Sequence, residues 1–68
     1  MKTKAELLQE FQLLQGVEQS AGDFYRRVAP ELPLAAEKAR ETFLAIAKDE
    51  DRHVEIVQKI LNIIQNTL

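Results

Sequence analysis

The stretch Ala29-Pro30-Glu31-Leu32-Pro33 contains both prolines of this 68-residue chain and decides its fold. Proline lacks a backbone N–H and disfavours helical geometry at the residue before it, so a helix breaks here. The chain has only two glycines, and no other segment interrupts a helix as strongly. The sequence therefore predicts two helices that are joined by one corner.

The first helix is expected over about residues 3–29 and the second over about residues 33–66, where proline suits the first helical turn. Thr3 and Glu6 have the spacing of a capping box, in which each side chain bonds the free backbone N–H of the other residue. Residues 1–68 then form a single domain of the all-α class. Its predicted architecture is an antiparallel two-helix hairpin.

Chain length and composition restrict what can stabilise such a hairpin. A chain of 68 residues has a marginal core of its own, and small scaffolds usually add disulfides, a metal or oligomerisation. The absence of cysteine excludes disulfides and thiolate-ligated metal sites. A metal bound through nitrogen and oxygen, self-association, or both are the remaining means.

Charge and hydropathy exclude several classes of partner. The net charge is −2 and the basic residues are scattered, so we expect no nucleic-acid partner. No apolar run approaches the roughly 20 residues of a membrane span, and no apolar segment follows the basic start as it would in a signal peptide. We therefore expect no membrane association, and a cytoplasmic location.

Each predicted helix carries an apolar seam with the alternating three- and four-residue spacing of a bundle core. The first seam consists of Leu7, Phe11, Leu14, Glu18, Ala21, Tyr25 and Val28. The second consists of Ala36, Ala39, Phe43, Ile46, Glu50, His53, Val57, Ile60 and Ile64. Other apolar residues widen the seams, and the three phenylalanines, Phe11, Phe24 and Phe43, are expected in the core.

Polar residues interrupt both seams near their middle. Glu18 interrupts the first seam, and Glu50 and His53, the only histidine, interrupt the second. Residues three apart share one face of a helix, so Glu50 and His53 can meet the same ion. An ionised carboxylate in an apolar bundle is costly unless it is paired or coordinates a metal. The three residues are therefore candidate metal ligands.

One chain supplies half of a known ligand set. Four-helix bundles that hold two metal ions use a Glu from each of two helices and a Glu-x-x-His from each of the other two. A two-fold dimer presents every residue twice and supplies the whole set. Its four carboxylates balance the charge of two divalent ions, while both histidines bind neutral. This donor set suits iron, with manganese as an alternative.

From about Glu18 to about Val57 the chain resembles the rubrerythrin branch of the ferritin-like superfamily. The matching residues are Glu18, Phe24, Tyr25, Ala29, Phe43, Ala47 and the run Asp49-Glu50-Asp51-Arg52-His53. The resemblance implies a di-iron centre, with two ions per dimer, that reacts with oxygen or peroxide. It also implies that the Tyr25 hydroxyl would hold a carboxylate ligand in place.

The departures from that family shape the expected assembly. A rubrerythrin-like domain has four helices in one chain, so two helices imply a homodimer or a larger even oligomer that completes a ferritin-like four-helix bundle. No cysteine-ligated iron domain is present, so electrons would come from an external donor. Encapsulated ferritins are the closer architectural parallel and suggest an encapsulin shell as a partner, but their cargo-loading tail is not evident in residues 61–68.

Several alternatives stay open at the level of sequence. His53 could be a surface or satisfied core histidine, and Glu18 could pair with a basic residue across an interface. The chain could store metal without turnover, or be a non-catalytic dimerisation module whose buried polar residues fix the register. No catalytic residue is assigned. Equal depth for Glu18 and Glu50 requires a turn near residue 34, whereas the prolines place it near 31.

Overall fold

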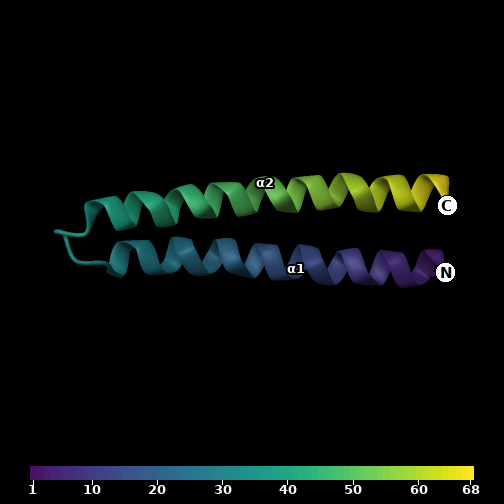
Figure 1. The fold of residues 1–68 in the computed structure, drawn as a ribbon, viewed down its shortest axis with the longest axis horizontal. Helices are drawn as coiled ribbons and strands as arrows, with labels where there is room; N and C mark the ends of the chain where they lie inside the picture. Colours follow the sequence, from purple (N-terminus) through teal and green to yellow (C-terminus); the bar gives the residue numbers. More distant parts are fainter.

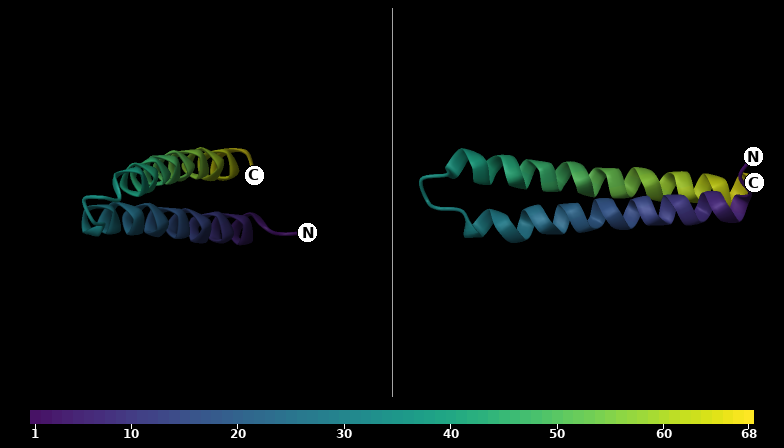
Figure 2. Two further views of the ribbon diagram at one scale, coloured as in Figure 1. Left: turned by 60° about the vertical axis from the view of Figure 1, so that its left-hand side comes forward. Right: turned by 60° about the horizontal axis from the view of Figure 1, so that its bottom comes forward.

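The computed structural model describes all residues, Met1–Leu68, and contains helices only. Helix α1 comprises Lys4–Val28, the 3₁₀ turn η1 comprises Ala29–Glu31, and helix α2 comprises Glu37–Thr67. The two helices lie side by side and antiparallel, so both chain ends meet at one end of a rod of 51 × 15 × 14 Å (Figure 1). Figure 2 shows the same pairing from two further directions. The predicted all-α hairpin is confirmed.

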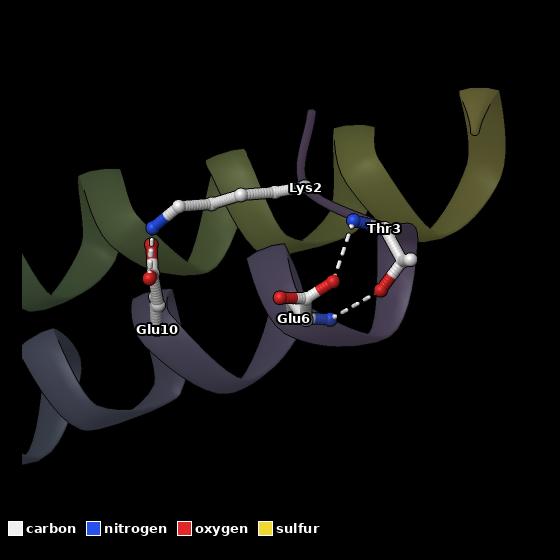
Figure 3. Close-up of polar contacts among 4 residues, drawn as sticks. All are labelled: Lys2, Thr3, Glu6 and Glu10. Carbon is white, nitrogen blue, oxygen red and sulfur yellow. Dashed lines mark hydrogen bonds and ion pairs between the residues drawn. The ribbon is translucent and has the colours of Figure 1, made fainter.

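The predicted capping box begins α1. The Glu6 backbone N–H donates to the Thr3 hydroxyl, and the Thr3 backbone N–H donates to the Glu6 carboxylate, both over 3.1 Å (Figure 3). The bond from the Thr3 backbone lowers the pKa of Glu6 below its ordinary value, and the Thr3 side chain lowers it further. Lys2 forms an ion pair with Glu10 beside this cap. Together these contacts fix the start of α1.

The corner is longer than predicted. The chain passes Pro30 as the 3₁₀ turn η1 and then leaves helical geometry until α2 begins at Glu37, not near Pro33. Pro33 instead opens a turn in which its carbonyl accepts from the Ala36 N–H. The Arg40 guanidinium donates to the carbonyls of Leu32 and Pro33 over 3.2 and 2.9 Å. These bonds satisfy corner carbonyls that a helix starting at Pro33 would have used itself.

The core inside one chain is small. Only six residues are buried, namely Gly22, Ala29, Ala47, Val57, Leu61 and Ile64, and no large side chain is fully buried. The expectation that Phe24 belongs to the core is wrong for the single hairpin, because 48% of it is exposed. Neither helix contains a window that is long and apolar enough to cross a membrane. Two helices alone thus leave most of the apolar seams partly exposed.

Candidate metal centre

The three candidate ligands meet halfway along the rod. Glu18 is the fifteenth of the 25 residues of α1, and Glu50 and His53 lie in the middle of the 31-residue α2. One donor atom from each of the three side chains lies within 4.8 Å of the other two. Glu18 and Glu50 can lie at equal depth because η1 continues the first helical segment past Pro30 and moves the turn toward residue 34. A single hairpin therefore brings the three predicted residues together.

The donor atoms lie too far apart for hydrogen bonds and at, or slightly beyond, the separation of two ligands of one ion. His53 Nδ1 lies 3.4 Å from Glu50 Oε1 and 3.7 Å from Glu18 Oε1. A nitrogen–oxygen hydrogen bond is usually 2.7–3.2 Å long. Two ligands of one ion at metal–ligand distances of about 2.1 Å lie about 3.0–3.4 Å apart. Small side-chain adjustments would thus place one cation between these groups.

Burial leaves one carboxylate oxygen without a partner. The side chains of Glu18 and Glu50 are 21% and 20% exposed, and that of His53 is 42% exposed. Glu18 Oε2 is buried and accepts no hydrogen bond. Buried polar atoms in native proteins almost always have a partner, and each exception calls for an explanation such as an ion. The three residues therefore fit a divalent cation, and the unpartnered oxygen supports this independently of their spacing.

Gly22 sets how closely the helices approach at this level. A Cβ atom at Gly22 would lie 3.2 Å from the Cβ of Glu50 and 3.6 Å from the carbonyl oxygen of Ala47. A side chain here would therefore press on the Cβ of Glu50, a candidate ligand, and would be in ordinary contact with the backbone of α2. The structure therefore gives Gly22 a packing role between α1 and α2.

We expect Gly22→Ala and Gly16→Ala to differ although both replace a glycine inside α1. Alanine in a helix interior is favoured over glycine by up to about 1 kcal/mol. A methyl group at Gly16 would meet no atom within 4 Å, so Gly16→Ala should gain that amount in urea unfolding. At Gly22 the tight contact with Glu50 should offset the gain. Equal stabilisation by both substitutions would contradict the packing role of Gly22.

Arg26 joins the two helices beside the three candidate ligands. Its guanidinium donates to Asp51 Oδ2 over 2.7 Å and to Asp23 Oδ1 over 3.0 Å. The hydrogen bond with Asp51, and then that with Asp23, raises the pKa of Arg26 above its ordinary value. This link was not predicted from the sequence, because a pair between residues 25 positions apart becomes visible only when the helices are placed in register.

Tyr25 contacts two aromatic rings and makes no hydrogen bond through its side chain. Its ring packs edge-on against Phe24 and Phe43, with centroids 5.5 and 5.4 Å apart. Its hydroxyl makes no hydrogen bond within the hairpin, although the resemblance implies a bond to a carboxylate ligand. The structure therefore shows Tyr25 as an aromatic contact between α1 and α2, and its role toward a ligand stays a prediction.

Comparisons with known proteins leave the resemblance as a prediction. The chain matches no protein-family model, and no curated protein or solved structure matches it significantly. A function can therefore be inferred only from the geometry of Glu18, Glu50 and His53.

Proposed function

We propose that this protein binds divalent metal through Glu18, Glu50 and His53, and that two copies build a centre for two ions, iron or alternatively manganese. The buried, unpartnered Glu18 Oε2 is the observation that carries the proposal. A cation would neutralise the carboxylates, and it would give that oxygen a partner when Glu18 binds it through both carboxylate oxygens. The metal preference follows from the donors, since carboxylate with imidazole suits iron and manganese.

The reaction that we assign to the centre is oxidation of ferrous iron or reduction of oxygen or peroxide. Two adjacent iron ions supply the change of valence when they are bound. The role of the chain is to fix the ligands: Gly22 keeps α2 close to α1, and the Arg26–Asp51 pair ties the helices on one side. His53, with 42% of its side chain exposed, remains open toward a partner. Reductive turnover would draw on an external electron donor.

The alternative is a non-catalytic helical dimerisation module in which the three polar residues fix the register. The many exposed apolar side chains support dimerisation under either function. The two differ in metal content, since the module needs no ion to balance its polar residues. Metal storage without turnover would use the same ligands. The cytoplasmic location and the encapsulin partner stay predictions.

Metal analysis of the purified protein tests the proposal. After growth with iron, or after anaerobic addition of ferrous iron and removal of the excess, we expect about one iron per chain, two per dimer. Glu50→Gln should lower this content several-fold because it replaces a charged ligand with a neutral amide. Glu55→Gln is the matched control, since Glu55 is an exposed acid on the same helix. An iron content near zero in the unmodified protein would refute the proposal.

A further inference from the structure

One long side of the hairpin is polar. Five amide side chains from both helices line a shallow groove there: Gln12, Gln15, Gln58, Asn62 and Gln65. Gln15 donates to Gln58 Oε1 over 3.0 Å across this groove. The Arg26–Asp51 ion pair continues the same side, because Asp51 precedes Gln58 by seven residues, close to two helical turns. These contacts define the polar side by direct interaction between α1 and α2.

The opposite side carries large exposed apolar residues, together with the exposed acids Glu10 and Asp49, which lie seven residues before Val17 and Ile56. Residues two apart on a helix lie about 200° apart around its axis, on nearly opposite sides. In α1, Val17 lies two residues from Gln15, and Phe24 lies two residues from Arg26. In α2, Ile56 lies two residues from Gln58, and Ile63 lies two residues from Gln65. Each of these four apolar residues is exposed, by 66%, 48%, 46% and 59% in that order. We call this surface, Val17, Phe24, Ile56 and Ile63 with the half-buried Ile60, the apolar side.

His53 belongs to the apolar side. It lies two residues from Asp51 on the polar side and seven residues from Ile60 on the apolar side. The open edge of the ligand cluster therefore faces the exposed apolar surface, and the Arg26–Asp51 pair lies on the other flank. An incoming group that completes the coordination must approach from the side where Val17 and Ile56 lie.

We infer that a second copy of this chain covers the apolar side and that the two hairpins pair antiparallel, with their corners at opposite ends. This inference deepens the proposed function, on which it rests for the role of His53. A second copy satisfies both needs of this surface, because it supplies apolar contacts along the rod and the other half of the ligand set. An unrelated apolar partner would supply only the first.

The size of the surface agrees with a second copy. One long side of the molecule measures about 51 by 15 Å, the scale of the roughly 800 Å² that each partner buries in a standard interface. Only six residues are buried in one chain, so pairing would supply most of the core. The half-buried seam residues of both helices would then become the centre of a four-helix bundle.

The position of the ligands favours the antiparallel arrangement. Glu18, Glu50 and His53 lie near the middle of their helices. A two-fold axis that crosses the rod at this level overlaps both hairpins along their full length and brings the two ligand clusters together. In a parallel pair the two-fold axis would run along the rod, and the two ligand clusters would meet at whatever level of the helices they occupied. Their central position would then have no explanation.

The interface is tested by comparing oligomeric states in sedimentation, without metal and with one ferrous ion per chain. We expect a dimer for the unmodified protein in both conditions. The double variant Val17→Glu, Ile56→Glu places four unpaired charges per dimer in the interface and should weaken dimerisation by at least about 100-fold. Leu44→Glu is the control, because Leu44 is 42% exposed and lies seven residues before Asp51 on the polar side. It should remain dimeric.

Circular dichroism of the double variant checks that its helices still form. We expect them to form, because both substitutions are at exposed positions of the hairpin. A monomeric unmodified protein in both conditions, or a double variant that dimerises as tightly as Leu44→Glu, would overturn the inferred interface. A dimeric protein that binds no iron would contradict the proposed metal site but not the inferred interface. The two failures are therefore distinguishable.

The orientation is tested with a spin label on Leu34→Cys, a unique thiol because the chain has no cysteine. Leu34 lies in the corner and is 91% exposed, so labelling should not disturb folding. In the antiparallel dimer the two labels should be separated by a distance that approaches the 51 Å length of the rod. A separation comparable to the 15 Å width would overturn the antiparallel pairing.

Discussion

Ferrous iron added anaerobically to the metal-free protein should raise its melting temperature by about 10–20 °C. A ligand that binds only the folded state at 100 times its dissociation constant stabilises that state by about 2.7 kcal/mol. Each kcal/mol shifts the melting temperature of a domain of this size by about 4–8 °C. Binding to the folded state is strongly preferred here because Glu18 and Glu50 belong to different helices. The measurement is a circular dichroism melt with and without iron.

The control for this melt is His53→Ala. Removing the imidazole takes one of three donors from each cluster, so the rise in melting temperature should fall to less than half. Glu55→Gln should leave the rise unchanged, since its side chain is exposed and takes no part in the cluster. An iron response that is equally large in His53→Ala would show that the ion binds elsewhere.

Glu18→Met should stabilise the metal-free protein while abolishing its response to iron. Glu18 is 21% exposed, and its Oε2 is buried without a partner. Leaving a buried acceptor unsatisfied costs about 1–3 kcal/mol, and an unbranched apolar side chain of similar size removes that cost. We therefore expect an increase of about 1–3 kcal/mol in the free energy of unfolding, measured in urea with a chelator present.

This substitution distinguishes two roles for Glu18: a metal ligand, or a partner in an ion pair across an interface, which the sequence left as an alternative. If a basic residue of a second copy paired with Glu18, Glu18→Met would leave that cation buried and lower the stability. Glu55→Met serves as the control and should change the stability by less than about 0.5 kcal/mol, as exposed substitutions usually do. A destabilised Glu18→Met with an unchanged iron response would contradict the proposed role of Glu18.

The sequence predicted the hairpin well because its strongest signals are local. The Thr3–Glu6 spacing specifies the cap through two bonds within one turn, and Pro30 and Pro33 remove backbone donors where they stand. The start of α2 was misplaced because it depends on Arg40. The guanidinium of Arg40 bonds corner carbonyls seven and eight residues away, and no local pattern specifies that contact.

The meeting of the three candidate ligands was predicted from periodicity, but their surroundings were not. Seam spacing puts Glu18, Glu50 and His53 on inward faces, and the structure brings them together. Periodicity describes the centre of a bundle and does not distinguish a half-bundle from a whole one. Phe24 was therefore expected inside and is 48% exposed in the hairpin. The contact of Gly22 with Glu50 depends on the distance between the helices, which residue spacing does not specify.

The ends of the hairpin constrain how two copies could be joined into one chain. The Lys4 ammonium donates to the Gln65 carbonyl over 2.9 Å, so the first and last turns of the helices meet. A short linker from one copy to the next would therefore hold the two copies with their corners at the same end. A tandem polypeptide with the opposite arrangement needs a connector that runs the 51 Å length of the rod, about 15 residues of extended chain. Duplication of this sequence with a long crossing segment, and not with a tight one, would preserve the inferred pairing.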